Sequence, residues 1–147
     1  MKIQTTTGYA LKILQYIHEA GGGMVKAGEI ADKLNISRLY MAKLLGIMKN
    51  AGLVHSVQGC NGGYHMTKTT KNTTVFEVYT AIEGDIHIYS PQVNIEEYKY
   101  EAAIKGYFDM VGDMVELFMR KTTICDLFDQ QSKEIRPKKQ RLERIAR

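Results

Sequence analysis

The fold of this chain is decided by residues 26–66, which read KAGEIADKLNISRLYMAKLLGIMKNAGLVHSVQGCNGGYHM. A short amphipathic stretch at residues 27–34 is followed by a turn at 35–37 and a second amphipathic stretch at 38–51. Asn35 tolerates the left-handed conformation that ends a helix. Ser37 can accept bonds from the free N–H groups that begin the next one. The order of helix, three-residue turn and helix predicts a helix-turn-helix.

A predicted hairpin follows the second helix directly. Residues 53–57 alternate as a half-buried strand, and residues 64–66 return antiparallel to them. Between them Gly59, Gly62 and Gly63 permit positive φ angles in a tight turn, and they also let the backbone approach a phosphate or a narrow minor groove. An isolated glycine-rich turn would prove nothing. Directly behind a helix-turn-helix, it predicts the wing of a winged helix-turn-helix.

The predicted helix at residues 38–51 has one apolar face, formed at helical spacing by Met41, Leu44, Leu45 and Met48. This face belongs in the core, so the other side chains of the helix are expected to point outward. At its N-terminal end, Arg38 suits a guanine edge and Leu39 suits a thymine methyl group. Tyr40 is expected to pack on the sugar-phosphate edge, and Lys43 to hold a phosphate.

A first helix is predicted from Thr6 or Thr7 to the glycine run at residues 21–23, and it serves as scaffold. At its start, the helix either crosses the DNA backbone and contacts it through the hydroxyls of Thr5, Thr6 and Thr7, or makes no such contact. Both alternatives stay open. The complete set of predicted contacts to double-stranded DNA is Thr5, Thr7, Ser37, Arg38, Leu39, Tyr40, Lys43, Gln58, Asn61, Gly62, Gly63 and Tyr64.

The distribution of charge is consistent with a polyanionic partner. Residues 1–71 hold nine Lys and Arg against three Asp and Glu, residues 72–131 hold four against eleven, and residues 132–147 hold seven against two. A basic N-terminal module suits DNA, because neutralising phosphates releases condensed counterions. Ordinary solvated surfaces would give the same numbers. The basic tail either strengthens DNA binding without reading sequence or is a solvated end.

A long helix is predicted from about residue 94 to residue 121. Its apolar positions recur near a 3.5-residue period, at Ile104, Tyr107, Phe108, Val111, Met114, Val115 and Phe118. A small winged domain cannot bury such a seam alone, so we expect the helix to pair with its twin in a homodimer. Packing within one chain is the alternative.

The sequence therefore predicts a mainly α fold with a small β-hairpin wing. Its predicted parts are a winged helix-turn-helix domain at residues 1–84, a segment with a loop, the long dimerisation helix and a short last helix at 85–131, and a basic tail at 132–147. No apolar run is long enough to cross a bilayer, and the N-terminus lacks the apolar core of a signal peptide. We expect a cytoplasmic protein with no membrane partner.

Enzymatic and metal chemistry find no support in the sequence. It contains no phosphate loop with a lysine, no ordered catalytic triad and no metal-ligand spacing. Two cysteines, Cys60 and Cys125, form neither a disulfide framework nor a paired-thiolate zinc motif. We predict a protein that is not an enzyme and that holds no metal and no cofactor.

Several short segments also match one known family in order. They are Tyr9-Ala10-Leu11, Ile36-Ser37, Tyr40, Leu44-Leu45, Ala51-Gly52-Leu53-Val54, Gly62-Gly63-Tyr64, Ala81-Ile82-Glu83-Gly84 and Thr123-Ile124-Cys125-Asp126-Leu127. In these segments, which span roughly residues 1–130, the chain resembles the bacterial winged-helix regulators of the Rrf-two type. The resemblance implies a homodimeric transcription regulator, expected to be a repressor, on a pseudo-palindromic operator. Each half-site would receive one wing and one recognition helix.

The departures from this family pattern are informative. Members that carry an iron–sulfur cluster hold three cysteines before the long helix, but residues 85–101 contain none, and Gly8 replaces an acidic ligand of some relatives. The resemblance is therefore to the cluster-free branch that includes the cysteine-metabolism repressor. Gln58 stands where many relatives have arginine, and Arg38-Leu39 replaces a common Glu-Lys pair, so a different operator is expected.

The signal that controls the regulator is left open. Cys60 is predicted to lie exposed at the wing tip, where oxidation or alkylation would place bulk or charge against phosphate; it is otherwise a tolerated loop residue. A small-molecule effector between winged domain and long helix, or a partner enzyme, would serve as well. The alternative function is a winged-helix module that binds only proteins.

Overall fold

The computed structural model of the 147-residue chain describes residues 5–90 and 98–129. Its elements, in chain order, are α1 (Thr5–Glu19), α2 (Ala27–Leu34), α3 (Arg38–Asn50), β1 (His55–Val57), β2 (Gly63–His65), α4 (Lys68–Lys71), α5 (Val75–Glu83), α6 (Tyr98–Lys121) and α7 (Ile124–Asp129). The prediction of a mainly helical fold with a small hairpin is confirmed. The predicted first residues of the long helix, at 94–97, and the basic tail at 132–147 lie outside the described residues.

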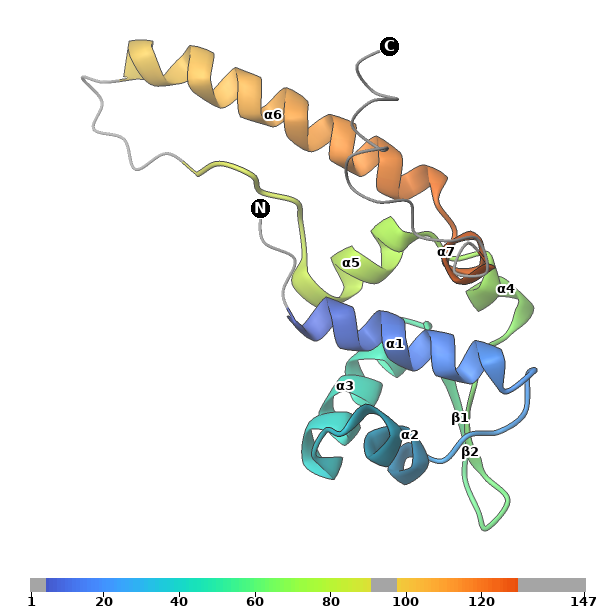
Figure 1. The fold of residues 1–147 in the computed structure, drawn as a ribbon. Helices are drawn as coiled ribbons and strands as arrows, with labels where there is room; N and C mark the ends of the chain where they lie inside the picture. Colours follow the sequence, from blue (N-terminus) through green and yellow to red (C-terminus); the bar gives the residue numbers. More distant parts are fainter. Residues whose placement is uncertain (1–4, 91–97, 130–147) are drawn as a thin grey trace, which may run out of the picture.

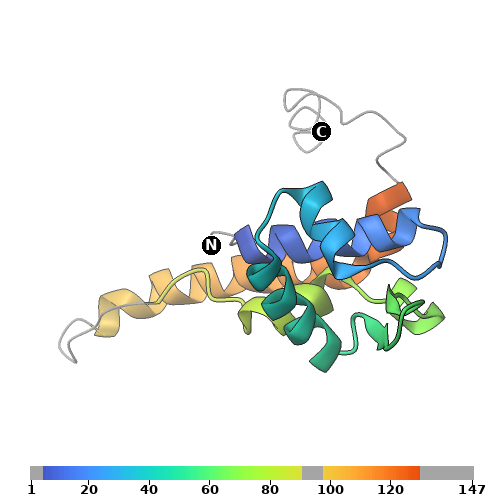
Figure 2. The ribbon, with the colours of Figure 1, turned by 90° about the horizontal axis from the view of Figure 1, so that it is seen from below.

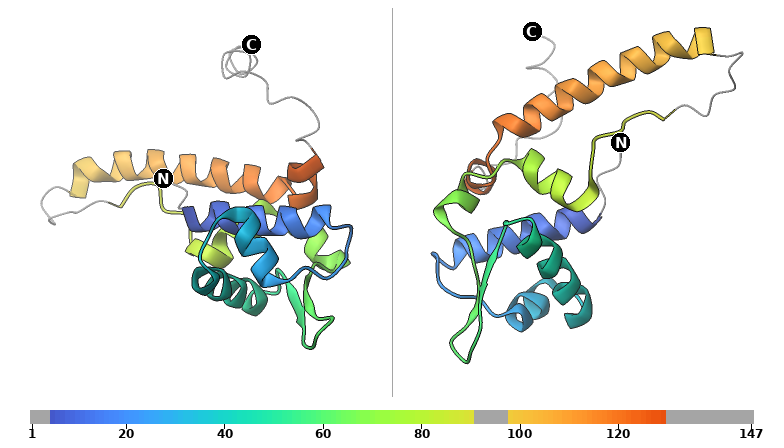
Figure 3. Two further views of the ribbon diagram at one scale, coloured as in Figure 1. Left: turned by 60° about the horizontal axis from the view of Figure 1, so that its bottom comes forward. Right: turned by 180° about the vertical axis from the view of Figure 1, so that it is seen from behind.

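Helix α1 runs through the middle of the molecule and separates two sides (Figure 1). On one side lie α2, α3 and the β1–β2 hairpin, and on the other lie α5 and α6. The turned views show that α6 extends well beyond the rest of the fold at its N-terminal end (Figures 2 and 3). The arrangement places the helix-turn-helix and the hairpin together, away from the long helix.

The core is built around α1 and α3. Helix α1 contributes Ala10, Ile13, Leu14 and Ile17, and α3 contributes the predicted stripe of Met41, Leu44, Leu45 and Met48. Burial of one such side chain stabilises the fold by roughly 1.5–3 kcal/mol relative to exposure. Around this centre pack Ile30, Val54, Val78, Ile124 and Phe128. Because α3 is fixed by its apolar stripe, its opposite face is turned outward.

The turn between α2 and α3 has the predicted local structure. Asn35 is left-handed, with φ 52° and ψ 50°, and it is the one non-glycine residue with positive φ among those described. The backbone N–H of Ile36 donates to the carbonyl of Ala31 at 3.0 Å. The side chain of Ser37 accepts a bond from the N–H of Tyr40 at 3.2 Å. These bonds satisfy groups that helix ends leave free and fix the angle at which α3 begins.

The hairpin is shorter than predicted. Its antiparallel register pairs His55 with His65 and Val57 with Gly63. Leu53 and Val54 are both buried, so these consecutive residues do not alternate and belong to the core rather than to the strand. Val25 adds a bridge to the return strand, where its N–H and carbonyl both pair with Tyr64, at 3.0 and 2.8 Å. The base of the hairpin is thus tied to the loop before α2.

Of the three wing glycines that permit a positive φ angle, Gly59 adopts one, with a φ of 110°. Gly62 and Gly63 are required for a different reason. A Cβ on Gly62 would overlap the carbonyl of Val57, and a Cβ on Gly63 would lie 2.7 Å from the carbonyl oxygen of Val25. Both glycines allow backbone to pack against backbone inside the wing.

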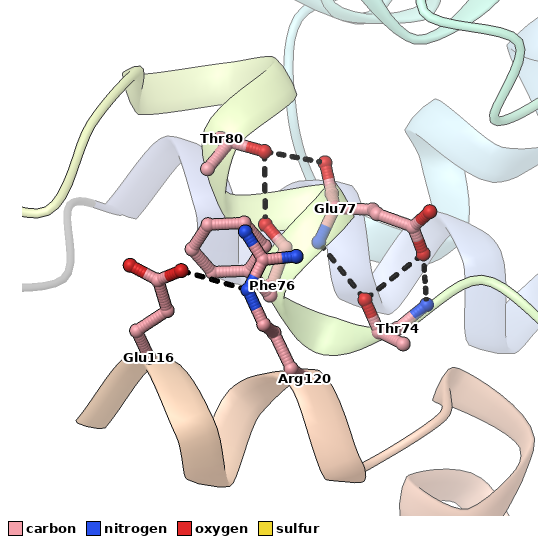
Figure 4. Close-up of polar contacts among 6 residues, drawn as sticks. All are labelled: Thr74, Phe76, Glu77, Thr80, Glu116 and Arg120. Carbon is pink, nitrogen blue, oxygen red and sulfur yellow. Dashed lines mark hydrogen bonds and ion pairs between the residues drawn. The ribbon is translucent and has the colours of Figure 1, made fainter. Parts of the chain in front are cut away.

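The junction between α5, α6 and α7 is held by caps and backbone pairs. Thr74 forms a capping box with Glu77 at the start of α5 (Figure 4), and Thr123 caps α7 with Asp126 as predicted. The Val75 N–H donates to the Thr122 carbonyl at 2.8 Å. The four-residue α4, which was not predicted from the sequence, has its own capping box at Thr67. Within the described ranges, no helix is both long enough and apolar enough to span a membrane.

Candidate nucleic-acid interface

The first turns of α3 present the outward side chains that the stripe predicted. Leu39 is 84% exposed, which is unusual for a large apolar side chain at a helix start. Arg38 and Lys43 are exposed on the same helix. The chain therefore carries a cation, an apolar side chain and a second cation on the free face of α3, beside the Ser37 cap.

Tyr40 departs from the expectation that it faces fully outward. Its ring packs edge-on against Tyr9 of α1, with ring centroids 5.9 Å apart, and it is half-buried. Its hydroxyl lies 3.3 Å from the Thr6 hydroxyl. Tyr40 therefore links α3 to the start of α1, and only part of its side chain remains accessible at the surface.

The predicted DNA contact by Thr7 does not fit the structure. Thr7 is 2% exposed, and its hydroxyl donates to the carboxylate of Glu83 at the end of α5. Because a buried hydroxyl with a protein partner cannot reach phosphate, Thr7 is a packing residue. Thr5 is exposed at the first described position of α1 and stays a predicted contact.

The wing tip has the predicted exposure. Gln58, Cys60 and Asn61 are exposed in the turn between β1 and β2. Tyr64 is half-buried against the core, and its backbone is already paired with Val25. The accessible polar groups of the wing therefore belong mainly to residues 58–61. Gly62, Gly63 and Tyr64 are half-buried and pack against the rest of the domain.

Carboxylates are few on this side of the molecule, and each has a side-chain partner. Glu19 accepts from Gln15, and Glu29 accepts from the Tyr16 hydroxyl, both at 2.8 Å. Asp32 lies 3.4 Å from the Arg38 guanidinium. The exposed cations outside these pairs include Lys26, Lys33, Lys43 and Lys49. Along residues 26–49, cations therefore outnumber carboxylates. The helices α2 and α3 of this segment lie with the wing, on the side away from α6 (Figure 3).

Helix α6 exposes a row of large apolar side chains. Of the predicted seam, Ile104, Tyr107, Met114 and Phe118 are exposed, while Val111 and Val115 are half-buried. Phe108 turns inward and stacks on Tyr89, with ring centroids 5.1 Å apart. Met110 and Leu117 are also exposed, and they were not predicted as part of the seam. Their separation by seven residues, one heptad, is the sequence signal that could have indicated them.

The inner face of α6 is attached to α5 near its C-terminal end. The Arg120 guanidinium lies over the Phe76 ring at 3.7 Å and donates through Nε to Glu116 at 2.7 Å (Figure 4). Met119, the preceding residue in the chain, is buried. Farther along, residues 86–89 and α6 border a partly open pocket of about 150 Å³ whose lining includes Asp113 and Gly112.

Comparison with known proteins agrees with this geometry. The model of the Rrf2 family, described as iron-dependent transcriptional regulators, matches residues 3–130. The chain belongs to the Rrf2 family. It is 31% identical over 128 residues to the transcriptional regulator CymR of Bacillus subtilis, covering 86% of this chain and 89% of that protein.

Two solved structures resemble the Rrf2 chain over most of its length. The structure of CymR, the global cysteine regulator of B. subtilis, has a TM-score of 0.70 and 29% identity, covering 88% of this chain and 97% of that one. CymR of Staphylococcus aureus in its oxidized form has a TM-score of 0.68 and 28% identity, covering 87% and 96%. As an Rrf2 protein with a winged helix-turn-helix, the chain is a DNA-binding transcription regulator.

The donor set of this Rrf2 protein does not fit an iron–sulfur cluster. Such clusters are held mainly by cysteine thiolates, and the two cysteines of the chain lie at the wing tip and on α7. Cys125 lies 4.0 Å from His18 Nδ1 of α1 and is partly buried. Across residues 5–90 and 98–129, no three His, Cys, Asp or Glu side chains gather into a possible metal site.

Proposed function

We propose that this Rrf2 protein is a homodimeric repressor in the cytoplasm that binds a pseudo-palindromic DNA operator. Each subunit would place the start of α3 in the major groove and its wing beside the same half-site. The observation that carries this proposal is the exposed face of α3, where Leu39 stands 84% exposed between Arg38 and Lys43. The start of a recognition helix is where side chains of this type meet base edges.

The chemistry of these side chains matches separate features of a duplex. A guanidinium can form two parallel bonds to guanine, and an apolar side chain can contact the methyl group of thymine. Lys43 supplies a point charge for phosphate. Ser37 leaves other N–H groups at the helix start available, and these attract anions. Gln58 and Asn61 add uncharged donors and acceptors at the wing tip.

The exposed face of α6 supports the homodimer. Ile104, Tyr107, Val111, Met114 and Phe118 follow one another at spacings of three and four residues, the pattern of a two-helix seam, and all of them but the half-buried Val111 are exposed. Exposure of several large apolar side chains in one row is a sign of an interface. A helix of 24 residues is about 36 Å long, which gives the seam enough length to set the distance between two recognition helices.

The proposal extends to how the dimer represses transcription and how it is released from DNA. A dimer that covers its operator would exclude other proteins from the same DNA. Release would follow from a small effector in the pocket beside Asp113, from a partner enzyme, or from oxidation of the exposed Cys60. A bulky or charged group at Cys60 would meet phosphate at the wing tip.

Footprinting on the DNA that flanks its own gene, followed by salt titration of the protected site, tests the DNA proposal. Arg38→Ala should weaken operator binding by about tenfold to a hundredfold, the range of a lost arginine–guanine contact. Lys49→Ala is the matched control, because it removes the same charge from the last turn of α3. A specific footprint that Arg38→Ala leaves unchanged would contradict this use of α3.

The exposed Leu39 also suits a protein partner, so a protein-binding winged module is the second candidate. The two differ in their response to sequence and salt. Operator binding should weaken steeply as salt rises and should prefer one sequence. Equal, weak binding to all DNA sequences would favour the protein-binding module.

The redox part of the proposal has its own experiment. Cys60→Ser should leave DNA affinity unchanged and blunt any loss caused by peroxide or quinones, whereas Cys125→Ser should keep that loss. Cys125 is the matched control because it is partly buried on α7. Oxidant sensitivity that is equal in the Cys60 variant and the wild type would exclude Cys60 as the sensor.

A further inference from the structure

We propose that Asp32 of α2 is a positioning residue that sets the base preference of Arg38. The inference rests on the proposed function, in which Arg38 reads a base. Asp32 Oδ2 lies 3.4 Å from Arg38 Nη2, across the turn that joins α2 to α3. The pair therefore links the second helix of the motif to the first residue of the recognition helix.

The guanidinium also lies against the backbone of α2. From the point where Gly28 would carry a Cβ, Nη1, Cζ and Nη2 of Arg38 are 3.4, 3.5 and 3.7 Å away. Because these distances are nearly equal, the guanidinium lies with its flat face toward Gly28. The N–H donors lie in that plane and point sideways. Asp32 takes one donor at one edge and leaves the others for a base.

Asp32 differs in its bonding partner from the other carboxylates on the same side of the molecule. Within residues 5–71, Glu19 is bonded to Gln15, and Glu29 is bonded to Tyr16. Asp32 is the one whose partner is a predicted base contact. A carboxylate that served only to reduce the positive charge of this surface would not need to contact Arg38.

The pair acts on orientation rather than on stability. Its side chains are 76% and 70% exposed, and ion pairs in water contribute little to folding. An arginine side chain, however, loses much rotamer freedom when it is fixed against a base. A neighbour that already restricts the guanidinium plane lowers that loss and favours one approach geometry. The planar fork of arginine makes the orientation matter for guanine.

The experiment measures binding of the full-length protein to its operator and to operators with each base pair of one half-site substituted. Asp32→Ala should reduce discrimination by about threefold to tenfold, at the base pair whose preference Arg38→Ala abolishes. In the double variant, the preference should be no weaker than in Arg38→Ala alone, because residues that act together are not additive. Asp32→Asn keeps an acceptor oxygen and should restore part of the preference.

Two further variants separate positioning from charge. Glu29→Ala removes the same charge from the same helix, so it should tighten binding to all DNA equally and leave base preference unchanged. Gly28→Leu keeps Asp32 but fills the space under the guanidinium, and it should relax the same base pair as Asp32→Ala. Thermal unfolding confirms that each variant is folded.

The outcomes distinguish this inference from the proposed function. If the wild type shows no preference for any operator, the proposed function itself fails. If the wild type is specific and Arg38 reads one base pair, but Asp32→Ala leaves that preference intact, only the inference is overturned. Uniform tightening on all DNA by Asp32→Ala, matching that of Glu29→Ala, overturns it as well.

Discussion

The guanidinium of Arg120 lies 3.7 Å from the centre of the Phe76 ring, and this contact joins α6 to α5 (Figure 4). A cation above an aromatic face is attracted by the negative potential of the ring. Glu116, one turn earlier on α6, accepts from Arg120 Nε and orients the side chain. The contact lies near the end of α6 that is attached to the winged domain.

Loss of this contact should destabilise the protein measurably. Arg120→Met keeps an apolar stem but removes the cation, and we expect the free energy of unfolding to fall by about 0.5–1 kcal/mol, the range for an exposed cation–π contact. Lys105→Met is the matched control, because it breaks an ion pair with Asp109 on the same helix. Denaturant unfolding gives both values, and equal losses would mean that the Phe76 contact contributes nothing.

A charge in the exposed row of α6 should dissociate the proposed homodimer. Met114 is 66% exposed, and Met114→Glu places a carboxylate where the seam of the twin helix would bury it. Sedimentation should show a change from two chains to one. Ala102→Glu adds the same charge at an exposed α6 position outside the seam and should leave the dimer intact. A Met114→Glu protein that still sediments as a dimer would place the interface elsewhere.

The bond between Thr7 and Glu83 should matter for stability and not for DNA. Thr7→Val removes the hydroxyl with little change of shape and leaves the carboxylate without this donor, so the free energy of unfolding should fall by roughly 1–3 kcal/mol. Thr5→Val, at an exposed position, should cost far less. The affinity for DNA at a fixed salt concentration should be unchanged by Thr7→Val. A weaker affinity in this folded variant would mean that Thr7 contacts DNA.

The thiol of Cys125 should make the protein less stable in alkali. Burial raises the pKa of the Cys125 thiol above its ordinary value of 9.0, and the nearby Asp129 carboxylate raises the pKa further. Below the pKa of the thiol in the unfolded chain, Cys125 keeps its proton in both the folded and the unfolded state. Its contribution to stability is then fully present. As pH rises above about 9, the unfolded chain loses the proton first, so stability falls until the pKa of the folded state is passed.

Cys125→Ser should therefore lose less stability than the wild type between neutral pH and the alkaline range. Thermal unfolding at a series of pH values measures the difference. Cys60→Ser is the matched control, because its thiol is exposed. Parallel curves for the wild type and Cys125→Ser would show that the thiol does not contribute.

Local signals in the sequence predicted the helix-turn-helix well. The cap at Ser37, the left-handed Asn35 and the apolar stripe of α3 each depend on neighbours within a few residues, and the structure has all of them. The short strand is a failure of the same local reasoning. Burial of both Leu53 and Val54 depends on how the chain enters the core, and alternation alone does not report it.

The parts that were missed depend on distant partners. Thr7 is bonded to a residue 76 positions away, and the close approach of Gly63 to Val25 requires the folded hairpin. Phe108 shares the spacing of the exposed seam, yet it stacks on Tyr89 of the preceding loop. A hydrophobic period identifies an apolar helix, but it does not say which side chains pack within the chain and which remain for a partner.

The attachment of α6 at one end has a mechanical consequence. Backbone pairs at Thr122 and Ile124, together with Arg120, fix its C-terminal end to the winged domain, while the opposite end projects outward. In a dimer built on this helix, a small tilt at the fixed end would swing each α3 through an arc and change the span between the two half-sites. In the proposed dimer, the tilt of α6 would therefore decide which operator spacings both recognition helices can reach.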